Sequence, residues 1–478
     1  MQHVRKTKII ATLGPATETP EMLRELIRAG VNIFRLNMSH AKPEKVREII
    51  PLIRQTAHEE SREVGILMDT QGPAIRTGDL PTKLNLKPGD EFTFTVLGEE
   101  CTEEYCVNVN YEGLVKDLQV GDEVIVDNGV LRMEVLAKSD NHIRCRVLTE
   151  GVMGSRRHIN LPGVRVNLPA LTEKDIEDVR LGCETDVDYI ALSFCREAAD
   201  VRELRRLCQK FGKSPRLVAK IEDQEAVRNL HDIVAVADAI MVARGDLGIE
   251  CLLEDLPIIQ RKIVKTCLRN FKPVIVATHM LESMIENPYP TRAEITDVAN
   301  AVFEQVDAVM LSGETTTGKY PKDCVLILDR IARRTERSGG ADYLSSMELE
   351  TSTEKHVRAA VHLADQVRAA AIVLFTRTGY MAAVASALRP RWSPVYAFTE
   401  SPQISRKLTL NRSIYPFMLS FADDPEQNIL RAEKILLEKD FLMPGNTIVV
   451  VTEFQSSKIL EAASAKRNVN SVELRVVE

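Results

Sequence analysis

The sequence lacks any uninterrupted run of about 18 apolar residues, the length that a membrane-spanning helix needs. Its first residues, MQHVRKTKIIATLG, contain neither the apolar core nor the small-residue cleavage site of a signal peptide. We therefore expect a cytoplasmic protein with no membrane partner.

Cysteine and histidine at metal-binding spacing are also missing. The nine cysteines form no CxxC pair and no cluster with histidine at zinc spacing, and several lie in or beside apolar runs. Such cysteines are typical of reduced core residues in a cytosolic protein.

A large excess of charge of one sign is missing as well. The chain has 62 basic and 69 acidic residues, a net charge of -7, and a hydrophobic fraction of 44%. This composition is typical of a globular protein and indicates no nucleic-acid partner. The 478 residues are enough for roughly two to four domains.

What the sequence does contain is a regular alternation of short apolar segments with amphipathic segments of helical period, which predicts a parallel sheet with helical crossovers. Residues 19–30 predict one helix between an N-terminal Thr-Pro and a terminal Gly, and residues 172–175 approximate a capping box. Eight strand segments begin at Lys8, Ile33, Val64, Tyr189, Arg216, Ala239, Val274 and Ala308. Because eight parallel strands close a TIM barrel, we expect an α/β fold with a (β/α)8 barrel in residues 1–70 and 171–340.

Residues 71–170 interrupt this alternation after the third strand. They read as short alternating strands with turn signals in KPGD (87–90), VGD (120–122) and DNG (127–129). We expect a small, inserted, β-barrel-like lid domain, and loops that follow barrel strands lie over the active-site face.

Residues 341–478 begin a new αβ series after a polar, glycine-containing linker. A helical stretch over residues 354–367 precedes the strand segments AAIVLFT, SPVYAFT, SIYPFML and NTIVVVT. The pattern predicts a separate three-layer α/β domain.

Glu222 and Asp246 each end a predicted strand close to a basic residue, in the strings KIE and RGD. Mg²⁺ accepts one or two carboxylates and fills its other positions with water and substrate oxygens, so this pair can hold Mg²⁺. A neighbouring ammonium, Lys220, then meets the anion that the metal holds, which indicates a phosphate or carboxylate substrate. A purely structural ion pair between Lys220 and Glu222 is the alternative.

Polar residues end seven of the eight predicted strands, and this convergence indicates an active site. They are Arg35, Asn37, Ser39 and His40; Asp69 and Thr70; Ser193; Lys220 and Glu222; Asp246; Thr278; and Ser312 and Glu314.

Subsets of these residues predict particular ligands. The four oxygen donors Asn37, Ser39, Asp69 and Thr70 suit K⁺ better than Mg²⁺, with ordinary strand-end hydrogen bonding as the alternative. Arg35, Lys220 and the backbone N–H groups at residues 245–246 fit a phosphate and a carboxylate on one small metal-bound ligand. Arg76 and His40 are positioned to reach a second, nucleotide phosphate, although His40 also fits a backbone-bonded strand end.

Taken in order, eight strings of the chain resemble pyruvate kinase over essentially its whole length. They are KIIATLGPAT, FRLNMSH, MDTQGPAIRTG, NLPGVRVNLPALTEKD, LVAKIED, MVARGDLGIE, ATHMLESM and MLSGETTTGKYP. The resemblance implies a barrel A domain, a B domain lid, a regulatory C domain and a homotetramer. It also implies transfer of the phosphoryl group of phosphoenolpyruvate to ADP, giving pyruvate and ATP, with Mg²⁺ and K⁺.

The resemblance also implies a role for each matching position. Glu222 and Asp246 correspond to Mg²⁺ ligands, and Lys220 to the cation over the migrating phosphoryl group. Arg35 corresponds to the phosphate-binding arginine, and Asn37, Ser39, Asp69 and Thr70 to K⁺ ligands. Thr278 falls near the enolate's methylene carbon, and Ser312 and Glu314 fall in a segment associated with a water relay. Ser193 and Gly245 complete the substrate set, and the nucleotide residues are Pro15, Asn37, His40, Arg76 and Arg157.

The chain departs from the family pattern at several positions. Ala74 stands where common members have a Glu tied to K⁺ dependence, so the K⁺ requirement stays open. Gln71, His279 and Asp223 replace a usual Lys, Gln and Asn, and we expect them to tune activity. Residues 376–380, TRTGY, resemble a phosphate-cradling turn, but VTEFQSSKILEAASAKRNVN replaces a glycine-rich effector loop, so we expect little response to fructose 1,6-bisphosphate.

Two other functions are compatible with an acidic pair on a barrel. A Mg²⁺-dependent lyase or aldolase acting on pyruvate-like oxyacids uses such a pair with a nearby Arg, but the lid insertion and the string MDTQGP argue against it. A non-catalytic metabolite-sensing module is the second, and the presence of Lys220, Glu222 and Asp246 argues against that.

Overall fold

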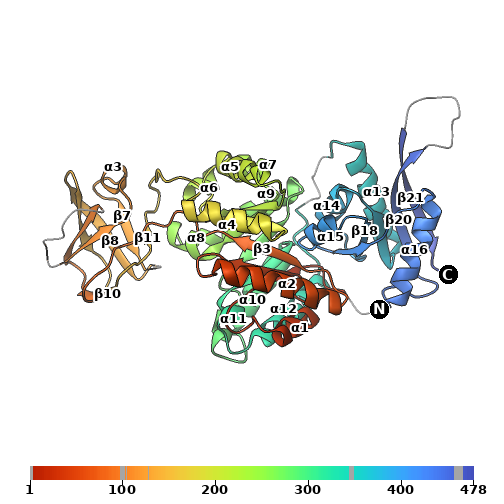
Figure 1. Ribbon diagram of the computed structural model, residues 1–478, viewed down its shortest axis with the longest axis horizontal. Coiled ribbons are helices and arrows are strands. Elements are labelled where there is room, and N and C mark those ends of the chain that lie inside the picture. The colour runs from red at the N-terminus through yellow and green to blue at the C-terminus, as the bar shows by residue number, and fades with distance from the viewer. Residues whose placement is uncertain (1–3, 97–102, 104, 128, 344–348, 457–466) are drawn as a thin grey trace.

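The computed structural model describes residues 4–96, 103, 105–127, 129–343, 349–456 and 467–478. A small β-rich unit lies at one end of the molecule, a barrel in the middle and an α/β unit at the other end (Figure 1). Within the described residues, no helix is both long and apolar enough to cross a membrane.

The central unit is a closed barrel of parallel strands in the order β1-β16-β15-β14-β13-β12-β3-β2. All eight strands lie where the sequence predicts them. They are β1 (Lys8–Thr12), β2 (Ile33–Asn37), β3 (Gly65–Asp69), β12 (Tyr189–Leu192), β13 (Arg216–Ile221), β14 (Ala239–Ala243), β15 (Val274–Ala277) and β16 (Ala308–Leu311).

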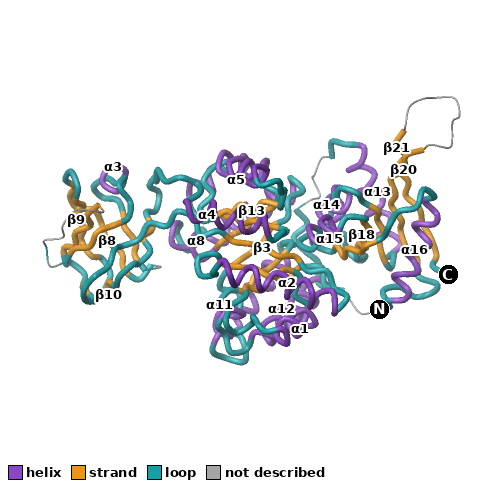
Figure 2. Tube along the Cα trace, viewed as in Figure 1, coloured by secondary structure: helices purple, strands orange, loops and turns teal. Residues whose placement is uncertain are grey.

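The barrel strands are buried on both faces, which explains their near-continuous apolar sequences. Ile10 packs inside the barrel with Met241 and Ile275, whereas its neighbours Ile9 and Ala11 pack outward against helices. Figure 2 shows the strands surrounded by helices. The barrel helices are α1 (Pro20–Ala29), α2 (Pro43–Glu59), α4 (Glu173–Glu184), α5 (Ala198–Lys210), α6 (Gln224–Arg228), α7 (Leu230–Val236), α8 (Arg244–Glu250), α9 (Leu256–Arg269), η1 (Glu282–Ile285), α10 (Arg292–Phe303), α11 (Gly313–Thr316) and α12 (Pro321–Glu336).

Helix ends in the barrel follow the predicted capping signals. The Thr19 side chain accepts a hydrogen bond from the N–H of Met22, and α1 ends at Gly30 with φ 113°. Thr172 and Asp175 form a complete capping box at the start of α4. Side-chain caps of this kind satisfy backbone N–H groups that have no partner within the helix.

In its described residues, the insertion between β3 and α4 is all-β apart from one short helix, as predicted. Gly89 and Gly121 adopt φ values of 94° and 92° in two of the predicted turns, a backbone conformation that favours glycine. A six-stranded sheet in the order β11-β7-β8-β9-β5-β6 carries most of it, beside the pair β10-β4. The elements are β4 (Leu84–Leu86), β5 (Glu91–Val96), β6 (Cys106–Val109), α3 (Leu114–Asp117), β7 (Glu123–Val126), β8 (Leu131–Lys138), β9 (His142–Val147), β10 (Gly151–Met153) and β11 (Ile159–Asn160).

The C-terminal unit has a five-stranded sheet in the order β19-β18-β17-β20-β21. Alternate residues of β17 face two separate apolar cores, so helices cover both faces and the predicted three layers are present. Its elements are α13 (Ser352–Val367), β17 (Ala371–Phe375), α14 (Tyr380–Ala387), β18 (Val395–Thr399), α15 (Pro402–Lys407), β19 (Ile414–Met418), α16 (Pro425–Glu438), β20 (Thr447–Ser456) and β21 (Arg467–Val476).

Two features of the sequence reading need correction. The segment that replaces the glycine-rich loop contributes to β20 and to an antiparallel strand, β21, that the sequence did not reveal, while residues 457–466 lie outside the described part. Seven cysteines are free in the described structure but Cys106 is disulfide-bonded, so the expectation that all nine are reduced is wrong.

Candidate active site

A polar cavity of about 420 Å³ is lined by residues from the carboxyl ends of the barrel strands and from the lid. This is the end at which parallel barrels carry their active sites. The residues that line it are Arg35, Asn37, Ser39, Thr70, Gln71, Ala74, Arg76, Asp127, Arg156, Arg157, His158, Ser193, Phe194, Lys220, Glu222 and Asp246. Ten of the predicted site residues are therefore brought together from strand ends and lid.

A buried network of opposite charges forms the floor of this cavity. Asp69 is fully buried and accepts a hydrogen bond from Arg35 Nε at 2.7 Å. Lys220 Nζ lies 3.3 Å from Asp69 Oδ1 and 2.8 Å from Glu222 Oε1, and it donates to Ser193 Oγ at 2.8 Å. Lys220 and Glu222 thus form the ion pair that was the structural alternative, and both residues also line the cavity.

The electrostatics of this network keep its cations charged. Burial alone would raise the pKa of Asp69, but Lys220 and Arg35 together hold it below its ordinary value. Burial opposes a charged Lys220, yet Asp69 and Glu222 raise its pKa above the usual range. Lys220 is therefore an ammonium at neutral pH, ready to meet an anion.

Glu222 and Asp246 provide the donor set expected for Mg²⁺. Glu222 follows β13, and Asp246 lies in the first turn of α8, directly after β14. The pKa of Glu222 is raised to about 7, chiefly by burial and also by the charge of Asp246, against the opposing effect of Lys220. A buried carboxylate whose pKa is raised by a second carboxylate nearby fits a site for a divalent cation. No group of three metal-ligating side chains occurs among the described residues, so other ligands would come from water and substrate.

The predicted K⁺ ligands lie at the ends of β2 and β3. Asn37, Ser39 and Thr70 line the cavity beside Ala74, and the carboxylate of Asp69 lies beneath them with its two cationic partners. Asn37 Oδ1 accepts from the N–H of Ser39, and Thr70 Oγ1 accepts from the N–H of Ser193. Neutral oxygen donors predominate here, which suits a monovalent ion.

The lid contributes a cluster of arginines to the cavity. Arg76 and Arg157 were predicted from the sequence. Arg156 lines the same cavity, next to an isolated antiparallel bridge between residues 76 and 158. Arg157 is 3.2 Å from Asp127 in a salt bridge. A cluster of guanidinium groups favours a polyphosphate ligand. Arg156, Asp127 and His158 were not expected from the sequence.

Seven predicted site residues do not line this cavity, namely Asp69, which lies beneath it, and six others. Pro15 and His40 are exposed outside it. The N–H of Gly245 donates to Thr278 Oγ1 at 2.8 Å, which in turn donates to Ala277 O. Glu314 accepts hydrogen bonds from the N–H groups of Leu281 and Ser312. Gly245, Thr278, Ser312 and Glu314 thus form a supporting layer around the strand ends.

Left-handed backbone conformations mark two strand ends. Phe194 follows β12 with φ 52°, and Thr278 and His279 follow β15 with φ 67° and 52°. Such conformations cost about 1–3 kcal/mol each and cluster at functional sites. At Phe194 the cost is offset by a hydrogen bond from its N–H to Glu222 Oε2 at 2.5 Å.

Comparison with known proteins agrees with this geometry. The family model of the pyruvate kinase barrel domain matches residues 4–325, and the model of the pyruvate kinase alpha/beta domain matches residues 354–462. The chain belongs to the pyruvate kinase family. It is therefore a phosphotransferase, with the barrel and α/β domains that characterise pyruvate kinases.

Individual pyruvate kinases resemble the chain over most of its length. Plastidial pyruvate kinase 2 of Arabidopsis thaliana is 40% identical over 94% of this chain and 78% of its own length. Pyruvate kinase 2 of Synechocystis is 40% identical over 93% of this chain and 76% of its own length. Pyruvate kinase of Clostridium perfringens is 38% identical over 95% of this chain and 97% of its own length.

Proposed function

We propose that the cavity between barrel and lid transfers the phosphoryl group of phosphoenolpyruvate to ADP, giving pyruvate and ATP. The observation that carries this proposal is the ammonium of Lys220, held between Asp69 and Glu222 at 3.3 and 2.8 Å and facing the same cavity as the lid arginines. Two cations at the floor, Lys220 and Arg35, and several at the roof suit a phosphoryl group that passes between two substrates.

Lys220 and Arg35 hold the phosphoryl group. Phosphoryl transfer needs positioning and neutralisation of charge more than covalent help from the protein. Arg35 is fixed by Asp69 and by Thr12 Oγ1 at 3.1 Å, so its guanidinium is oriented before the substrate arrives. Ser193, which receives a hydrogen bond from Lys220, keeps the ammonium aligned.

Glu222 and Asp246 hold Mg²⁺, which when bound neutralises oxygens of the substrates. Asn37, Ser39, Asp69 and Thr70 hold K⁺ at the neighbouring strand ends. Ala74 brings no charge to this part of the cavity, so the dependence on K⁺ is weaker than in relatives with a Glu there.

The nucleotide binds on the lid side. Arg76 and Arg157 face the cavity from the lid and meet the phosphates of ADP, with Arg156 as a third cation. Asn37 lines the cavity from the barrel, and Pro15 and His40 lie outside its lining, where a nucleotide that extends past the rim would meet them.

Enolpyruvate released by the transfer is protonated at carbon near Thr278. The Thr278 hydroxyl is held between Ala277 O and the N–H of Gly245, next to the helix that carries Asp246. Glu314 uses its carboxylate oxygens on two backbone N–H groups, which favours a positioning role for Glu314 and Ser312 in holding ordered water rather than direct proton transfer.

The proposed localisation, oligomeric state and domain bounds follow the resemblance to the pyruvate kinase family. We place the enzyme in the cytoplasm, as a homotetramer, with residues 1–70 and 171–340 as A domain, 71–170 as B domain and 341–478 as C domain. The turn at residues 376–380 is the feature of the C domain that resembles a phosphate-cradling turn. We expect the activity to respond only weakly to fructose 1,6-bisphosphate.

Glu222→Gln tests the metal site. We expect the Mg²⁺ concentration for half-maximal turnover of phosphoenolpyruvate and ADP to rise by about 100-fold or more, because a neutral amide replaces one of two charged ligands. Asp232→Asn removes the same charge from an exposed side chain in the first turn of α7 and is the matched control. An unchanged Mg²⁺ titration in Glu222→Gln would assign the metal to other residues.

A further inference from the structure

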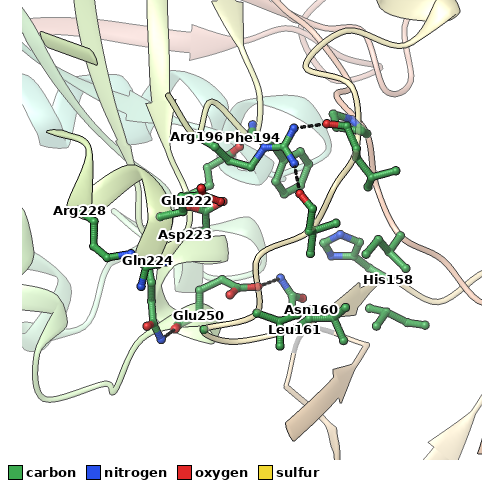
Figure 3. A pocket seen from close by; sticks show the side chains of 18 residues that line it. His158, Asn160, Leu161, Phe194, Arg196, Glu222, Asp223, Gln224, Arg228 and Glu250 are labelled. Atoms are coloured by element: carbon green, nitrogen blue, oxygen red, sulfur yellow. Dashed lines mark hydrogen bonds between the residues drawn. The ribbon is translucent and has the colours of Figure 1, made fainter. Parts of the chain in front are cut away.

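A second cavity, of about 70 Å³, lies at the junction of lid and barrel. It is distinct from the active-site cavity, although His158, Phe194 and Glu222 line both and form the wall between them. His158 and Phe194 stack within this wall with ring centroids 5.9 Å apart. Figure 3 shows the second cavity with the side chains that surround it.

Asn160, Gln224 and Arg196, three of the donors around this cavity, are already used, while the exposed Arg228 also lines it. Asn160 of lid strand β11 donates through Nδ2 to Glu250 Oε1 at 2.9 Å, which connects the lid to the end of α8. Gln224 Nε2 donates to the backbone oxygen of Glu250 at 2.6 Å. Arg196 directs its guanidinium to the backbone oxygens of Val166 and Leu168 (Figure 3). None of these groups needs a further acceptor.

Acceptors, by contrast, are left over. Asn160 is 4% exposed, and its Oδ1 atom is buried without a hydrogen-bond partner. Glu250 is 9% exposed, and burial raises its pKa to about 7, as expected for a carboxylate that lacks a cation. Asp223 also lines the cavity, but its Oδ1 already accepts a hydrogen bond from the N–H of Ala226 at 2.7 Å. Buried acceptors without donors are rare and costly in folded proteins, so the cavity calls for a donor.

Much of the remaining wall is apolar, beside the charged side chains of Glu225 and Arg228. Ile75, Leu161, Val164, Val166 and Leu168 contribute aliphatic surface. A bare metal ion does not suit such a wall, and no group of three metal-ligating side chains occurs in the part of the chain that the structure describes. A ligand with hydrogen-bond donors at one end and a short hydrocarbon body matches both halves of the lining.

We propose that this hinge cavity binds a small organic ammonium ion. Its ammonium group donates to Asn160 Oδ1 and to the carboxylate of Glu250, and its hydrocarbon body lies against Leu161 and Val164. An ammonium has three donors and no acceptor, which is the complement of this set of side chains. The bound ion would join lid strand β11 to α8, the helix whose first turn carries Asp246, and so would brace the lid against the barrel.

The test uses propylammonium as the probe and the full-length protein with saturating Mg²⁺ and K⁺, so that cation sites in the active cavity are already filled. Binding is measured by ligand-detected NMR and calorimetry, with propanol and propionate as probes of the same body length. We expect propylammonium to bind in the millimolar range and the other two probes at least about tenfold more weakly, because only the cation makes a charge-assisted hydrogen bond.

Three variants localise the binding. Glu250→Gln removes the charge and Val164→Phe fills the cavity, and each is expected to weaken propylammonium binding by about tenfold or more. Glu254→Gln removes an exposed carboxylate from the loop after α8 and should bind as the unaltered protein does. Thermal melting verifies that each variant is folded.

Each other outcome overturns the proposal. Equal binding of propanol would show an apolar cavity without a cation site, and equal binding by Glu250→Gln and Val164→Phe would place the ion elsewhere. No binding at all would show that the cavity holds only water. Because the readout is binding, these outcomes do not depend on whether the protein turns over phosphoenolpyruvate.

Discussion

Lys220→Met is expected to bind phosphoenolpyruvate almost as the unaltered enzyme does and to lose about 10³-fold or more of its kcat. The ammonium matters chiefly to charge that develops on the phosphoryl group during transfer, and an interaction made mainly in the transition state lowers kcat when it is removed. Steady-state kinetics at saturating Mg²⁺ measure this, with KM for phosphoenolpyruvate as the second readout.

The variant is expected to fold, because Asp69 keeps Arg35 as a partner at 2.7 Å. Lys210→Met, on the exposed face of α5, is the matched control and should leave kcat unchanged. A Lys220→Met enzyme with near-normal kcat would show that the ammonium has no part in the chemical step, and a raised KM with unchanged kcat would reduce it to a binding residue.

Asp307→Ala is expected to destabilise the protein by about 3–5 kcal/mol, the cost of leaving a buried charge without its partner. Asp307 lies at the amino-terminal end of β16, where the C-terminal unit covers the barrel. Its carboxylate accepts two hydrogen bonds from the guanidinium of Arg389, at 3.0 and 2.6 Å. It also accepts hydrogen bonds from the N–H groups of Arg412 and Val274, each at 3.0 Å. The side chains of Asp307 and Arg389 are 1% and 4% exposed.

Urea unfolding followed through Trp392 measures this effect. Trp392 is the single tryptophan of the chain and lies close in sequence to Arg389, so its fluorescence reports on the unit that this contact holds. The double variant Asp307→Leu with Arg389→Met should lose less stability than Asp307→Ala, because no guanidinium is left unpaired. Asp140→Ala, which removes an exposed carboxylate, should change stability by less than about 0.5 kcal/mol. A similarly small effect of Asp307→Ala would show that Arg389 finds another partner.

Much of the barrel could be predicted because its signals are local and repeated. Each strand is a short apolar run, and the helices between them carry caps such as Thr19 and the Thr172–Asp175 box. The floor of the active site follows from the same logic, since parallel strands that end in Asp69, Lys220 and Glu222 must bring these residues to one rim.

The roof of the site could not be predicted in the same way. Arg156, Asp127 and His158 reach the cavity only because the lid folds back over the strand ends, and no local pattern distinguishes them from ordinary surface residues. The hydrogen bonds that Glu314 and Thr278 form with backbone groups could not be predicted for a related reason. The residue type at a strand end shows where a polar side chain starts. It does not show whether backbone groups of a neighbouring loop will form hydrogen bonds with that side chain and so keep it from a ligand.

The most direct test of the account is the stoichiometry of the reaction itself, measured with phosphoenolpyruvate, ADP and Mg²⁺ in matched buffers containing K⁺ or only a bulky organic cation. We expect pyruvate and ATP to form in equal amounts in both buffers, with only a modest gain from K⁺, because Ala74 brings no charge to the site formed by Asn37, Ser39, Asp69 and Thr70. Pyruvate with inorganic phosphate and no ATP would show that the phosphoryl group passes to water instead of ADP, and no product in either buffer would contradict the proposed function.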